Sequence, residues 1–168
     1  MSKRPNSIFL GILLICGSCV RLGAQQSEQV PEAPVPPAII DAETAFVSNG
    51  GQEGNFQMVR DSWYSGGPNR AYNQFYAAMK AWGHFKLVSS PADADVVFEI
   101  SFDNRESNVS QFKLVFIEPK THVTLWTLTR NIEPAGMAKN REKNYDIAMS
   151  ALMNDLKTVA SAAMAAQN

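Results

Sequence analysis

The chain has 168 residues, of which 45% are hydrophobic, and it carries 15 basic and 16 acidic residues for a formal net charge of −1. This length suits one domain with a core of its own. The absence of a basic surplus argues against a nucleic-acid-binding protein. The only two cysteines lie within the first 19 residues, which excludes disulfides and cysteine-ligated zinc in the rest of the chain.

Residues 1–24 have the pattern of a secretory signal peptide. Lys3 and Arg4 precede an apolar run from Ile8 to Cys16, and small residues follow. A membrane-spanning helix needs roughly 20 apolar residues, so a cleaved signal is favoured over an uncleaved anchor. Leu22-Gly23-Ala24 offers an ordinary cleavage site before Gln25.

A second cleavage hypothesis involves Cys19. Gly17-Ser18-Cys19 resembles the end of a bacterial lipobox, in which the cysteine is lipidated and becomes the mature N-terminus. Several acyl chains hold a protein firmly at a membrane. The two hypotheses therefore distinguish an exported protein of the periplasm or extracellular space from an outer-membrane lipoprotein. Ordinary cleavage leaves 144 residues, with 12 basic and 16 acidic side chains.

Residues 25–41 are predicted to be a disordered linker, because they contain four of the nine prolines and such stretches favour extended chain. A plain disordered terminus is one interpretation, and a tether between a lipid at Cys19 and the folded part is the other. A single α/β domain is predicted over residues 42–168.

The domain alternates between strand and helix patterns. Its predicted elements are a short strand over 43–47, a helix over 69–82, a strand over 85–88, three strands over 95–103, 111–117 and 122–130, and a long helix from Asn144. Asn69 and Gly83 are expected to cap the first of these helices. Two amphipathic helices on one face of a mixed or antiparallel sheet of four to five strands make a two-layer α+β sandwich.

Residues 62–70 form the best binding candidate. Trp63 and Tyr64 are adjacent aromatic residues, and Arg70 follows them after two glycines on a predicted loop. Tryptophan, tyrosine and arginine dominate interface hot spots. An equally weighted alternative is that Trp63 folds back over the core.

Patterns that indicate catalysis are weak. Asp95, Glu99 and Asp103 share one face of a strand at about 13 Å per four residues, which is too far apart for one catalytic pair. His84 and His122 have no partner at metal-ligand or triad spacing. A small periplasmic hydrolase that uses these carboxylates or His84 is kept as the alternative function, and no metal or cofactor is predicted.

Three segments resemble a known family. They are Gly83-His84-Phe85-Lys86-Leu87-Val88, Ala94 to Ile100, and Phe112 to Thr121 running on to Leu125-Trp126. This order is similar to the N-terminal α/β domain of periplasmic TolB, to related envelope domains of the CsgG and LpoB type, and to small exported bacterial proteins of unknown function. Glu99 stands near where the TolB pattern has glycine, and no β-propeller repeats follow.

The resemblance implies an envelope-associated module that is not an enzyme, and it carries over no catalytic residue. The predicted function is therefore an exported cell-envelope binding or accessory domain whose partner is an envelope protein or component. Contact with a membrane is expected only through a lipid at Cys19. The sequence does not indicate the identity of the partner or the oligomeric state.

Overall fold

The computed structural model describes residues 33–54, 64–106 and 109–165. The predicted signal peptide, Cys19 and Trp63 lie outside these residues. In chain order the elements are α1 (Pro37–Ile40), β1 (Thr44–Gly54), α2 (Arg70–Trp82), β2 (Lys86–Leu87), the short 3-10 helix η1 (Pro91–Asp93), β3 (Val96–Glu106), β4 (Val109–Ile117), β5 (Thr124–Ile132) and α3 (Ala138–Ala165).

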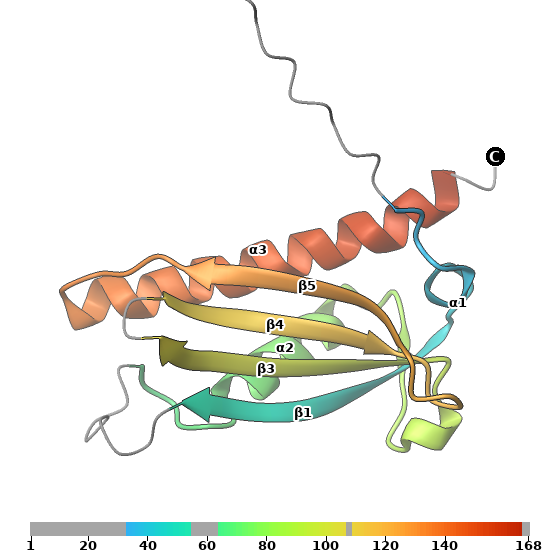
Figure 1. Ribbon diagram of the computed structural model, residues 1–168, viewed down its shortest axis with the longest axis horizontal. Coiled ribbons are helices and arrows are strands. Elements are labelled where there is room, and N and C mark those ends of the chain that lie inside the picture. Colours follow the sequence, from blue (N-terminus) through green and yellow to red (C-terminus); the bar gives the residue numbers. More distant parts are fainter. Residues whose placement is uncertain (1–32, 55–63, 107–108, 166–168) are drawn as a thin grey trace, which may run out of the picture. The chain divides into compact units, whose positions relative to one another are not determined.

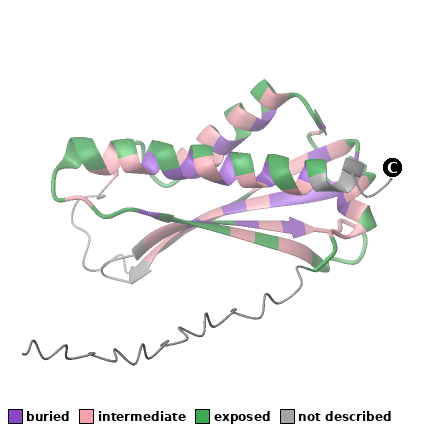
Figure 2. Cartoon of the chain, turned by 90° about the horizontal axis from the view of Figure 1, so that it is seen from above, coloured by how far each residue is buried: buried purple, intermediate pink, exposed green. Residues whose placement is uncertain are grey.

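The strands form one mixed sheet in the order β2-β1-β3-β4-β5. Figure 1 shows β1, β3, β4 and β5 side by side in this order. β1 lies parallel to both β2 and β3, whereas β4 and β5 continue the sheet as antiparallel neighbours. Helices α2 and α3 cover one face of this sheet (Figure 2). The predicted two-layer α+β sandwich is therefore confirmed.

Alternation along the strands explains which face is covered. The even-numbered apolar residues of β3, Val96 to Phe102, are all buried. From Phe98 onward they pair with residues of β4 that are also buried, namely Phe116, Leu114 and Phe112. Side chains of directly paired residues lie on the same face. The opposite face carries Glu99, Ser101 and, on the neighbouring strands, Lys113 and Thr129.

The helices supply the other half of the core. Phe75 and Met79 of α2, together with Leu152 and Leu156 of α3, are at most 1% exposed. They recur at the spacing of an amphipathic helix. Gly83 ends α2 in the left-handed conformation with φ 67°, as predicted, because glycine adopts this conformation without a steric cost.

Strand β1 is longer than the predicted strand and contains an irregularity. Its pairing with β3 shifts between Asn49 and Gly51. A Cβ atom on Gly50 would come within 3.1 Å of the Ile100 carbonyl oxygen, and Gly51 has φ 79°. Both positions therefore favour glycine, and the strand continues past them through a bulge.

Two element boundaries also differ from the sequence prediction. Helix α3 begins at Ala138 rather than at Asn144, and the Asn144 side chain donates a hydrogen bond to the Glu133 carbonyl oxygen. Helix α1 lies within the stretch predicted as linker, and Ile39 is 2% exposed in the core. The packed part of the chain therefore includes residues before position 42. Among the residues described here, no helix has both the length and the apolar character needed to cross a membrane.

Candidate functional site

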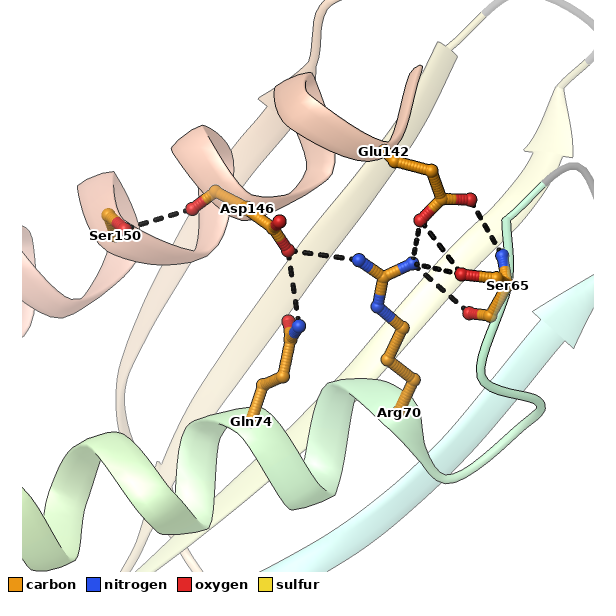
Figure 3. Close-up of polar contacts among 6 residues, drawn as sticks. All are labelled: Ser65, Arg70, Gln74, Glu142, Asp146 and Ser150. Carbon is orange, nitrogen blue, oxygen red and sulfur yellow. Dashed lines mark hydrogen bonds and ion pairs between the residues drawn. The ribbon is translucent and has the colours of Figure 1, made fainter. Parts of the chain in front are cut away.

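Arg70 is the centre of a polar cluster between α2 and α3 (Figure 3). Its Nη1 donates to the Ser65 carbonyl oxygen at 3.1 Å and pairs with the Glu142 carboxylate, while Nη2 donates to Asp146 Oδ1 at 2.9 Å. Glu142 also accepts a 2.7 Å hydrogen bond from the Ser65 backbone N–H. We call Ser65, Arg70, Glu142 and Asp146 the Arg70 clasp.

The clasp rests on aromatic rings. The Arg70 Cζ atom lies 4.0 Å from the centre of the Tyr145 ring, which suits a cation–π contact. Tyr64 packs on the same ring at a centroid distance of 5.2 Å and meets Phe102 edge-on at 5.5 Å. Burial raises the pKa of the Tyr145 hydroxyl, so this side chain stays neutral. Through Tyr64, the residues before α2 therefore pack against Phe102 of β3 and Tyr145 of α3.

The ion pair between Arg70 and Glu142 shifts the pKa of each of the two groups in favour of its charged form. Burial opposes the charge on Glu142, but the hydrogen bonds from Ser65 and the ion pair with Arg70 outweigh it, and the pKa of Glu142 is lowered. Burial also disfavours the charge on Arg70, yet the bonds to Glu142 and Asp146 prevail and raise its pKa. Both residues therefore stay charged at neutral pH and hold each other in place.

The side-chain amide of Gln74 bonds to the clasp through its nitrogen only. Gln74 Nε2 donates to Asp146 Oδ1 at 3.1 Å, whereas Gln74 Oε1 is buried without a hydrogen-bond partner. Asp146 Oδ1 therefore accepts hydrogen bonds from two donors, Arg70 Nη2 and Gln74 Nε2. The carboxylate of Asp146 thus bridges the first and second turns of α2.

The clasp leaves an exposed turn between its two ends. Ser65, Gly66, Gly67, Pro68 and Asn69 are all exposed. Asn69 makes no side-chain cap on α2, contrary to prediction, and instead accepts a 2.9 Å hydrogen bond from Asn49 Nδ2 next to the β1 bulge. The turn is therefore held at one end by α3 and at the other by β1.

Two of the three predicted binding residues come together in the structure. Tyr64 and Arg70 both contact Tyr145, and the Arg70 side chain is only 12% exposed. Trp63 lies outside the described residues, so the hypothesis that it covers the core stays a prediction. Sequence reasoning missed Glu142 and Asp146, which are 72 and 76 residues away from Arg70.

The residues considered for catalysis lie in different parts of the fold, and they contact different neighbours. Asp95 Oδ2 accepts hydrogen bonds from the hydroxyl and the backbone N–H of Thr44, and these bonds lower the pKa of Asp95. Glu99 lies on the sheet face opposite the helices, and the His84 ring stacks on Trp82 at 4.7 Å. Within the part of the chain that the structure describes, no three His, Cys, Asp or Glu residues could together hold a metal ion.

No protein-family model matches the chain, and no curated protein matches it in sequence. Solved structures that are similar to it include the LpoB C-terminal domain from Salmonella enterica, with 15% identity over 60% of this chain and 96% of that one and a TM-score of 0.39. A dodecameric PelC from Paraburkholderia phytofirmans has 13% identity over 68% and 87% of the two chains, with a TM-score of 0.41.

A third similar structure is a neuraminyllactose-binding hemagglutinin homolog from Helicobacter pylori. It is 9% identical over 80% of this chain and 94% of that one, with a TM-score of 0.44. The first of the three structures is of the LpoB type that the sequence resembles, and none of the three is a TolB or CsgG protein. With TM-scores below 0.5 and identities of 15% or less, these similarities carry no argument about the architecture of this chain or the role of any of its residues.

Proposed function

We propose that this protein is an exported, non-catalytic binding domain of the bacterial cell envelope, and that residues 65–69 with Trp63 form its binding surface. One observation carries the proposal: the Arg70 clasp and the hydrogen bond between Asn49 and Asn69 fix an exposed turn against two helices and a strand. A turn that is ordered before binding loses less conformational entropy when a partner docks. The clasp therefore favours binding by keeping the turn ordered before a partner docks.

The chemistry of the clasp favours binding over catalysis. A general acid or base must exchange a proton with a substrate near its operating pH. The pKa of Glu142 is lowered, the pKa of Arg70 is raised, and burial raises the pKa of Tyr145. All three shifts oppose proton exchange near neutral pH, so these groups position the turn and do not react.

A photoreactive residue placed in the turn tests the binding surface. Pro68 is exposed and makes no backbone N–H donor, so its replacement in the full chain disturbs little. Irradiation of producing cells should give one discrete cross-linked species. The matched control is the same residue at Thr129, which is exposed on the opposite face of the sheet. Equal cross-linking from both positions, or none from Pro68, would contradict the proposed surface.

Export requires a separate measurement, because the first 32 residues lie outside the described structure. The intact mass of the protein recovered from membrane and soluble fractions distinguishes the two processing hypotheses. A soluble form that begins at Gln25 indicates ordinary cleavage, and an acylated form that begins at Cys19 indicates a lipoprotein. An unprocessed chain that stays in the cytoplasm would contradict the proposed location.

A further inference from the structure

The outward side of α3 carries a ridge of basic residues. Lys139, Lys143 and Ile147 follow one another at four-residue spacing, and all three are exposed. Residues four apart lie on one side of a helix. Lys157, also exposed, extends the basic character toward the C-terminal half, where its Nζ lies 5.9 Å from the Trp82 ring. We call Lys139, Lys143, Ile147 and Lys157 the α3 ridge.

The acidic residues of α3 are all paired with arginines, although Asp146 lies beside the ridge, three positions after Lys143. Glu142 and Asp146 are paired with Arg70 of α2, and Asp155 is paired with Arg130 at the end of β5. No other acidic residue occurs in α3, and α2 contains none. Glu133, in the connector before α3, is the acidic residue that precedes the helix. The ridge is therefore a local basic surface on a chain with a net charge of −1.

The same end of α3 exposes apolar side chains. Ile147 is 54% exposed, and Met137, one residue before the helix, is 67% exposed. A single exposed apolar residue needs no explanation, but here two of them flank Lys139 and Lys143. Figure 2 shows exposed stretches recurring along α3 on the side away from the sheet. Lysines near a helix N-terminus also oppose the helix dipole, so the pattern does not serve the stability of α3.

We propose that the α3 ridge lies on an anionic lipid surface, with the lysines at lipid phosphates and with Ile147 and Met137 in the headgroup region. Basic residues beside exposed apolar ones are typical of helices that lie in a membrane interface. The ridge runs from Lys139 to Lys157, about 27 Å along α3, and a straight ridge matches a flat surface. This contact is separate from a lipid at Cys19 and from the turn at residues 65–69.

Vesicle binding tests this contact with the full chain. The bound fraction is compared on vesicles of phosphatidylcholine alone and on vesicles containing about 30% phosphatidylglycerol, at low and high salt. Each lysine near an anionic surface contributes about fivefold in affinity. The double variant Lys139→Glu/Lys143→Glu should therefore lose at least about tenfold of its affinity for the anionic vesicles. Its affinity for the neutral vesicles should not change. Any binding through the apolar run in the first 24 residues is the same in both chains and is measured by these neutral vesicles.

The control variant makes the same change in net charge on another surface. Lys113→Glu/Lys120→Glu alters two exposed lysines, one on the sheet face opposite the helices and one in the turn after β4, and should retain anionic binding. Equal losses in both double variants would show that only net charge matters and would overturn the proposal. Ile147→Ser should weaken vesicle binding. If Ile147→Ser has no effect and polyglutamate binds the ridge as well as the vesicles do, the partner is an acidic polymer and the membrane proposal is wrong.

Discussion

Replacement of Arg70 by alanine should destabilise the domain much more than replacement of Arg130. Both arginines form ion pairs with α3, but the Arg70 side chain is 12% exposed and that of Arg130 is 47% exposed. Breaking a fully buried pair costs roughly 3–5 kcal/mol, whereas an exposed pair contributes roughly 0.2–1 kcal/mol. The Glu142 and Asp146 side chains are 30% and 60% exposed, so we expect a loss of about 2–3 kcal/mol for Arg70→Ala.

Thermal and urea unfolding measure this difference. In a domain of this size a loss of about 2–3 kcal/mol lowers Tm by roughly 6–12 °C, while Arg130→Ala should change the free energy of unfolding by less than about 1 kcal/mol. A double-mutant cycle between Arg70→Ala and Glu142→Gln should give a coupling of about 1–2 kcal/mol. If Arg70→Ala costs no more than Arg130→Ala and the coupling is zero, the clasp does not hold the turn.

Three further predictions follow from individual contacts. Because the pKa of Glu142 is lowered from its ordinary value of 4.5, the stability that wild type gains over Glu142→Gln should be complete above about pH 5 and should decline as the pH falls through 4.5 toward the lowered pKa of the folded state; urea titrations from pH 3 to 7 check this, and a gain that does not change between pH 7 and pH 3 would contradict it. Gly83→Ala should cost about 1 kcal/mol because Gly83 has φ 67° with no atom within 4 Å of a new Cβ, whereas Gly136→Ala, which meets equally open space without a positive φ, should be close to neutral in the same unfolding assay. Lys139→Glu should raise Tm slightly, because it replaces a positive charge in the first turn of α3 by a negative one; a lower Tm would show that Lys139 makes a stabilising contact.

The sequence predicts those elements whose packed face is apolar. The stripe of Phe75 and Met79 and the row from Val96 to Phe102 follow from periodicity alone, because burial selects side chains at helical or strand spacing. The first turns of α3 lack such a stripe. Residues 138–143 are rich in lysine, arginine and glutamate, which are good helix formers without packing against the core, so periodicity places the start of the helix too late.

The clasp could be predicted only in part. Tyr64 and Arg70 attract attention as residue types, but their role depends on Glu142 and Asp146, more than 70 positions away. On α3 these two acids follow the common pattern of a charged helix surface. Only the packing of α2 against α3 turns them toward Arg70. Arg70, which the sequence suggests as a residue that contacts a partner, instead forms ion pairs within the domain. We therefore assign the proposed binding surface to the exposed turn beside it.

The most direct test of the account asks whether the clasp matters for binding. The photoreactive residue at position 68 is combined with Glu142→Gln, and its cross-linking yield in cells is compared with that in the parent chain, at a temperature where unfolding curves show both to be folded. We predict that the cross-linked species falls to less than about half, because the turn loses its fixed position and pays the entropy of ordering on binding. An unchanged yield from a folded Glu142→Gln chain would contradict the claim that the Arg70 clasp presents the binding surface.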